Sequence, residues 1–232
     1  MIDTSFIISA FFWSAATIAL YAGTRLAHRK FRKWWTAPVI LAPVLLISLA
    51  LLAHIGYGEY IRGTHWLLAL IGPATTAFAA PIYRQRALIR QHWPVLLAGM
   101  VAGTGASIAS AYGLALALGL DRAMMLTLIP RSVSTPFAMS IAGTIGGVPA
   151  LAAVFVIVTG VIGAVLGEFL IYRLPLRSAL SRGALFGAGA HAVGTNKAYQ
   201  LAPEDGAIAG LVMVLSGIGN VLIVPLLWHW LA

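Results

Sequence analysis

A basic residue and three hydroxyls interrupt an otherwise apolar part of the sequence, the stretch PRSVSTP at residues 130–136. Arg131 is the only charged residue of the stretch, and Ser132, Ser134 and Thr135 carry its hydroxyls. A charged side chain is costly at membrane depth, so it usually faces a cavity there and has a function. A guanidinium can hold a carboxylate through two hydrogen bonds. If the stretch were a helical turn, Ser134 and Thr135 would share the face of Arg131. We therefore predict an anion-binding site here.

A second polar interruption lies in the glycine-rich segment GAGAHAVGTNK at residues 187–197. Its candidate substrate ligands are His191, Gly194, Thr195, Asn196 and Lys197. Exposed N–H groups near its glycines could bind an anion, as helix N-termini do. His191 could also carry a coupled proton, because the histidine pKa lies near physiological pH. The alternative is that the glycines serve close packing and that Lys197 lies at a cytoplasmic edge. We expect the two interrupted segments to meet and to form one site.

Other residues extend or limit this hypothesis. Thr75 and Asn220 lie in apolar runs and could complete the cavity, although lone hydroxyls and amides in membrane helices more often bond a neighbouring helix. Arg131 could instead reach the outer headgroups or pair with Glu168.

The sequence contains no P-loop, no metal-ligand spacing and no hydrolase nucleophile motif. We therefore expect a protein that is not an enzyme, without catalytic residues, metal or cofactor.

The elements that carry these segments are predicted from composition. Of the 232 residues, 60% are hydrophobic and 9% are charged, and the mean hydropathy is +0.93. A soluble domain of this size could not hide so much apolar surface, so we predict an all-α polytopic membrane protein, with one transmembrane domain over 1–232. The net charge of +9 comes from basic residues at the ends of apolar runs, which indicates topology and not nucleic-acid binding.

Loop charges decide between two topologies. Full spans are expected at about 5–27, 38–55, 66–83, 94–118, 150–172 and 207–231, and interrupted segments at 124–147 and 183–201. If 124–147 crosses completely, the basic loop from Arg173 to Arg182 lies outside and breaks the positive-inside rule. If it turns back, that loop lies inside. We predict six spans and two opposed re-entrant hairpins, with the N-terminus outside; the alternative is eight spans, two of them broken. Opposed interruptions are typical of secondary transporters with an inverted repeat.

Several motifs of the chain resemble the LrgB/CidB family, in order and over most of its length. They occupy residues 72–75, 130–136, 145–150, 190–197 and 205–207. Two basic residues are exchanged relative to the family pattern, with Arg131 where lysine is usual and Lys197 at the arginine position. Charge is kept at both positions, which fits a site that needs charge. Ala190 replaces the usual serine and Asn196 the usual alanine, which leaves substrate preference open.

The resemblance implies two functions. Bacterial members are described as holin-like regulators of murein hydrolase export and cell lysis, acting with a small LrgA/CidA membrane partner. Plastid relatives move glycolate and glycerate, and some bacterial pairs are linked to pyruvate uptake. We expect a secondary transporter of small monocarboxylates (pyruvate, lactate, glycolate or glycerate) in a bacterial cytoplasmic membrane. The holin-like function is the alternative. A homo-oligomer, such as a dimer, and an LrgA/CidA-like partner are further expectations.

Overall fold

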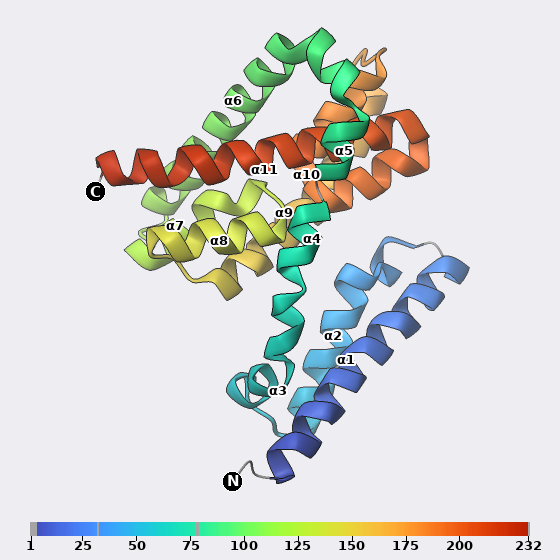
Figure 1. Cartoon of the computed structure of the whole chain (residues 1–232), viewed down its shortest axis with the longest axis vertical. Coiled ribbons are helices and arrows are strands. Elements are labelled where there is room, and N and C mark those ends of the chain that lie inside the picture. Colours follow the sequence, from blue (N-terminus) through green and yellow to red (C-terminus); the bar gives the residue numbers. More distant parts are fainter. Residues whose placement is uncertain (1–3, 32, 78, 232) are drawn as a thin grey trace. The chain divides into compact units, whose positions relative to one another are not determined.

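The computed structural model describes residues 4–31, 33–77 and 79–231. Every regular element within these ranges is a helix, as the sequence predicts. The chain divides into two compact units, Met1–Thr76 and Ala77–Ala232 (Figure 1). The expectation of a single domain over 1–232 stays a prediction.

The first unit packs two helices against α1. Its elements are α1 (Thr4–Phe31), the short 3-10 helix η1 (Trp34–Thr36), α2 (Pro38–Leu52) and α3 (Tyr57–Ala69). Ser14 on α1 joins α3 twice: its Oγ donates to the Gly63 carbonyl at 3.2 Å and accepts from Trp66 Nε1 at 2.8 Å. The approach is close, because a Cβ on Gly63 would lie 2.8 Å from Ala10 Cα.

The predicted span at 66–83 is divided among several helices, and its crossing of a membrane stays a prediction. The chain forms α3, then α4 (Ile71–Ala77) and α5 (Ala79–Arg84). Proline lacks an N–H, and its ring clashes with the carbonyl four residues earlier. For Pro73 that residue is Ala69, where α3 ends.

The second unit contains the long apolar helices. Its remaining elements are α6 (Arg86–Ala117), α7 (Arg122–Leu128), the 3-10 helix η2 (Ile129–Ser132), α8 (Thr135–Ile145), α9 (Pro149–Arg173), α10 (Ala179–Leu201) and α11 (Pro203–Leu231). Within the described residues, three helices are long and apolar enough to cross a membrane: α6, α9 and residues 203–228 of α11. The prediction of a helical membrane protein is supported, while the count of six spans stays a prediction.

The interrupted segment at 124–147 folds into a helical hairpin, which we call hairpin 1. Its first arm is α7 with η2, its second arm is α8, and the chain turns at the extended residue Val133 (φ −126°, ψ 172°). The base closes where the Val148 N–H donates to Thr127 Oγ1 at 2.8 Å, although the two residues are 21 positions apart. A straight helix would separate them by about 30 Å. Residues 127 and 148 therefore lie side by side, and the chain reverses its direction between them.

α10 is a second helical hairpin, which we call hairpin 2. It turns at His191 (φ 45°, ψ −126°). A Cβ on Gly194 would lie 2.4 Å from the Phe186 carbonyl oxygen, whereas a straight helix places residues eight apart about 12 Å from each other. The base closes where Arg182 in the first turn binds Asp205, just after the last turn. The arms are residues 179–190 and 192–201.

The two hairpins enter from opposite ends of α9 and α11. Near the start of α9, Ala152 and Val156 share an apolar core with Ile141 and other residues of hairpin 1. Toward its other end, the glycines of α9 contact hairpin 2. A Cβ on Gly163 would lie 2.3 Å from the Gly189 carbonyl oxygen, and one on Gly167 would lie 2.8 Å from the Phe186 ring. The structure thus contains two opposed hairpins, and the inverted repeat stays a prediction.

Candidate substrate site at the hairpin tips

One residue from each hairpin tip, Ser132 of residues 132–135 and Ala188 of residues 188–192, lies at a common recess. η2 contacts both α10 and α6. The recess is small, about 10 Å³, which is room for about one water-sized solute. It is lined by Gly103 and Thr104 of α6, Ser132 of hairpin 1, Ala188 of hairpin 2, and Ser216 and Asn220 of α11. The two interrupted segments therefore meet, as the sequence predicts.

Polar side chains of neighbouring helices are joined around this recess. Asn220 Nδ2 donates to Thr104 Oγ1 at 3.0 Å and to the Ser216 carbonyl at 2.8 Å. Ser107 of α6 donates to Ser132 Oγ. These bonds tie α6 to α11 and to hairpin 1, so the recess has a defined lining.

Each tip also buries a polar side chain that has no hydrogen-bond partner within the described part of the chain. These atoms are Ser134 Oγ in hairpin 1 and both ring nitrogens of His191 in hairpin 2. Ser134 is 3% exposed and His191 is 2% exposed. Leaving a buried polar group unsatisfied costs about 1–3 kcal/mol. Such exceptions call for an explanation, and a bound solute that supplies the missing partner is one.

Arg131 does not share a helical face with Ser134 and Thr135, and that expectation was wrong. The extended residue Val133 separates η2 from α8, so no helical turn spans the motif. Arg131 Nη2 instead donates to Ser110 Oγ on α6 at 3.1 Å. The alternative pairing of Arg131 with Glu168 is also absent, because Glu168 Oε1 binds Lys197 Nζ at 2.8 Å. Arg131 forms no ion pair with the described residues and keeps donors for a ligand.

The second predicted cluster is spread along the second arm of hairpin 2. Only His191 and, buried in the turn, Gly194 lie near the tip. Thr195 Oγ1 lies 3.9 Å from Met213 Sδ, Asn196 is exposed, and Lys197 is engaged by Glu168. The sequence could not show this spread, because it depends on where the helix turns.

Several residues outside the hairpins also bear on the site. Asn220 lines the recess, and its amide also bonds the neighbouring helix α6, the alternative that the sequence left open. The side chain of Thr75 lies outside the described part of the chain. Sequence reasoning missed Thr104, Ser107 and Ser216 as site residues. Their spacing was an available signal, because Thr104 and Ser107 are three residues apart and Ser216 and Asn220 four, which places each pair on one helix face.

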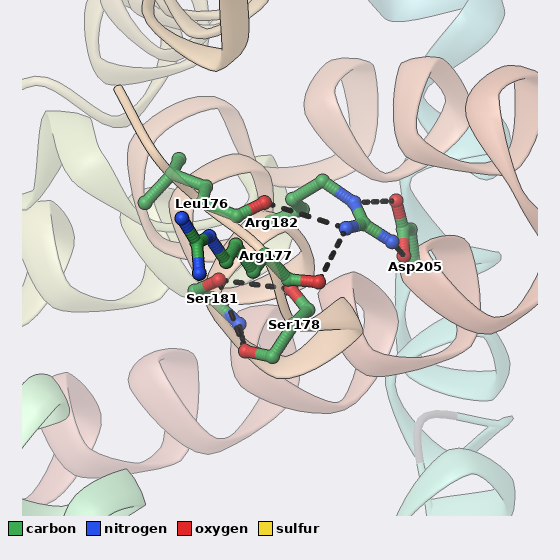
Figure 2. A network of polar contacts seen from close by, with 6 residues as sticks. All are labelled: Leu176, Arg177, Ser178, Ser181, Arg182 and Asp205. Atoms are coloured by element: carbon green, nitrogen blue, oxygen red, sulfur yellow. Dashed lines mark hydrogen bonds and ion pairs between the residues drawn. The ribbon is translucent and has the colours of Figure 1, made fainter.

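An ion pair fastens the base of hairpin 2. Arg182 Nε and Nη2 donate to the two carboxylate oxygens of Asp205 at 2.7 and 2.9 Å, and its Nη1 donates to the Arg177 carbonyl at 3.1 Å (Figure 2). The Asp205 side chain is 2% exposed and that of Arg182 is 28% exposed. The hydrogen bond with Asp205 raises the pKa of Arg182 above its ordinary value, so its charge is kept. The pair joins the first arm of hairpin 2 to the start of α11.

The backbone at His191 leads to a first prediction. Its positive φ is a conformation that residues with a Cβ rarely adopt, at a cost of about 1–3 kcal/mol. Glycine adopts it without that cost. We therefore expect His191→Gly to be more thermostable in detergent than His191→Ala, because both variants lose the imidazole and only alanine keeps the strain. Equal melting temperatures of the two variants would contradict strain at this position.

The fold and the site together define a helical membrane protein with two opposed hairpins that meet at a polar recess. A profile of the LrgB-like family matches residues 17–230. The chain therefore belongs to the LrgB-like family, as its motifs predict.

Relatives support this membership over nearly the whole chain. YwbG of Bacillus subtilis (strain 168), described as an uncharacterized protein, is 34% identical over 211 residues, which are 91% of this chain and 94% of YwbG. YxaC of the same organism, also described as uncharacterized, is 32% identical over 87% of this chain and 88% of its own length. The holin-like protein CidB of Staphylococcus aureus (strain N315) is 26% identical over 91% of this chain and 92% of its own length. No solved structure matches the chain.

Proposed function

We propose that this protein is a secondary transporter of small monocarboxylates of the pyruvate, lactate, glycolate or glycerate type. One observation carries the proposal: two hairpins from opposite ends of α9 and α11 meet, and the tip of each buries a polar side chain that has no partner among the described residues. Secondary transporters place substrate at such a midpoint between discontinuous helices, where small movements expose it to either side. A protein that only perforated a membrane would not need this arrangement.

Arg131 is the proposed ligand of the carboxylate. Its guanidinium gives one hydrogen bond to Ser110 and meets no acidic side chain of the described residues. The neighbouring α8 begins at Thr135, and the N-terminus of a helix carries a partial positive charge. Ser134 and His191 would face the rest of the substrate, and Thr195 and Lys197 lie further along hairpin 2. The site thus offers a cation and a helix N-terminus to an anion.

The relatives named holin-like proteins favour a second function, a membrane assembly that permeabilises the bilayer or controls the export of lytic enzymes. It differs from a carrier in an observable way, since a pore passes unrelated solutes without saturation. We also propose, from the sequence, a location in a bacterial cytoplasmic membrane with the N-terminus outside, and an LrgA/CidA-like partner.

Counterflow in proteoliposomes tests the proposal. Labelled pyruvate or glycolate should exchange saturably against unlabelled monocarboxylates. Arg131→Ala should raise the half-saturating concentration about 10- to 100-fold, because a hydrogen bond to a charged group contributes about 1.5–3 kcal/mol. Arg131→Lys should retain part of the activity, because it keeps the charge.

Arg177→Ala is the matched control, because Arg177 is exposed and uses only its backbone carbonyl in the contacts of hairpin 2. Unchanged exchange in Arg131→Ala would overturn the assigned carboxylate ligand. Leak of unrelated solutes without saturation would favour the holin-like function. Exchange that appears only after an LrgA-like protein is added would make the transporter a two-protein complex.

A further inference from the structure

We propose that the recess between the hairpin tips binds a single Na⁺ ion, and that this ion is coupled to the substrate. The coupling rests on the proposed transport function, whereas the binding of the ion does not. Nothing in the carboxylate proposal requires this site, because Arg131 points to Ser110 and does not line the recess.

The orientation of the Asn220 amide decides whether it offers a donor or an acceptor to a ligand in the recess. A carbonyl oxygen can only accept, so the amide atom 2.8 Å from the Ser216 carbonyl must be the nitrogen. The second hydrogen of this Nδ2 goes to Thr104 Oγ1. Both amide hydrogens are therefore used within the protein, and Asn220 Oδ1 accepts no hydrogen bond from the described residues. The amide offers an acceptor to a ligand, and it has no donor left.

Hydroxyl oxygens supply the other polar atoms of the lining. Ser216 Oγ makes no hydrogen bond to the described residues, although Ser216 is buried. Ser132 Oγ accepts from Ser107, and Thr104 Oγ1 accepts from Asn220, and each oxygen has a second lone pair. With Asn220, four residues that carry a side-chain oxygen line the recess. Oxygen ligands suit a hard cation, and hydroxyl groups can present their lone pairs to it while their hydrogens point elsewhere. No cationic side chain that would favour a carboxylate lines the recess.

The charge of the lining selects the valence of the ion. No acidic side chain is among the residues that line the recess. Sites for Ca²⁺ and Mg²⁺ generally include carboxylates, and the described residues contain no cluster of acidic or histidine ligands suited to a metal. Neutral oxygens alone match a monovalent ion, whose dehydration they can offset without an opposite charge.

The C-terminal ends of two helical segments at the recess also favour a monovalent cation. η2 ends at Ser132, and the first arm of hairpin 2 ends just beyond Ala188, so both first arms present their C-terminal ends at the recess. These ends carry partial negative charge, and C-terminal ends of half-helices are known ligands of Na⁺ in transporters. An ion here would touch both hairpins, α6 and α11. Its binding would therefore favour the arrangement in which the tips meet.

Thermal unfolding of the purified protein in detergent, without substrate, tests the binding. NaCl should raise the melting temperature saturably, whereas KCl and N-methylglucamine chloride at equal ionic strength should not. Ser216→Ala should raise the half-saturating Na⁺ concentration at least about tenfold, since even residues behind the ligands have that effect in metal sites. Folding should survive this change, because the Ser216 hydroxyl has no partner in the described residues. Ser140→Ala, exposed on α8, is the matched control.

Two outcomes overturn the site: no Na⁺-specific shift in the unchanged protein, or the same Na⁺ response in Ser216→Ala and Ser132→Ala as in Ser140→Ala. An equal response to K⁺ would overturn the choice of ion. Uptake driven by an imposed Na⁺ gradient tests the coupling. Saturable exchange that does not depend on Na⁺ would overturn the coupling but not the transport function. A Na⁺-dependent melting temperature without any exchange would support the ion site and overturn the transport function.

Discussion

Replacing Gly194 by alanine is expected to prevent hairpin 2 from closing. The new Cβ would lie 2.4 Å from the Phe186 carbonyl oxygen and 2.6 Å from Ala190 Cβ. Both neighbours belong to the opposite arm, and one is a backbone atom, so neither can move without opening the turn. Overpacking in a core usually costs about 1–3 kcal/mol, and we expect the upper end of that range or more here. The measurement is the melting temperature and the monodisperse yield in detergent, with counterflow on what remains folded.

Gly189 offers the control in the same tip. A Cβ there would meet nothing within 4 Å, and alanine is the better helix former of the two residues. Gly189→Ala should therefore fold like the unchanged protein. If the two alanine variants behaved alike, the tight turn of hairpin 2 would be wrong, and with it the proposed meeting of the two tips.

Loss of Arg182 is expected to have the second large effect. In Arg182→Met the Asp205 carboxylate, with only 2% of its side chain exposed, would lose both hydrogen bonds of the guanidinium. Removing one member of a buried ion pair leaves an uncompensated charge, which is strongly destabilising. We expect a several-fold fall in the yield of folded protein, which size-exclusion chromatography of fluorescent fusions would measure.

A double variant separates the lost charge pair from lost packing. Arg182→Met with Asp205→Leu removes both charges, and such replacements are often tolerated. It should recover a large part of the yield, so the two changes should be clearly non-additive. Lys197→Met is the comparison, because its ion pair with Glu168 is exposed (29% and 41% of the side chains) and should contribute only about 0–1 kcal/mol. An equal fall in the yield of folded protein in Arg182→Met and Lys197→Met would contradict a larger stabilising contribution from the buried pair.

The hairpins could be predicted from local chemistry, because prolines, glycines and one charge mark where a helix cannot continue at membrane depth. Loop charges then indicated that both segments turn back. The side-chain roles could not be predicted in the same way. Whether Arg131 and Ser134 share a face depends on one extended residue, Val133. Whether Lys197 is available depends on Glu168, which lies on another helix. Such pairings arise between helices, and the sequence of either helix alone does not contain them.

The packing of hairpin 2 also constrains the order in which the chain can be assembled. One arm of α10 lies against Asp205 and Ala209 of α11, and the other lies against Gly206 and Met213. Both arms thus depend on a helix that the ribosome makes after them. Helices that cross only half of the membrane and end in a polar turn are not stable in lipid alone, because the backbone N–H and C=O groups at their ends need hydrogen-bond partners. We expect α10 to wait unfolded at the membrane surface during synthesis, and to enter together with α11 as one unit.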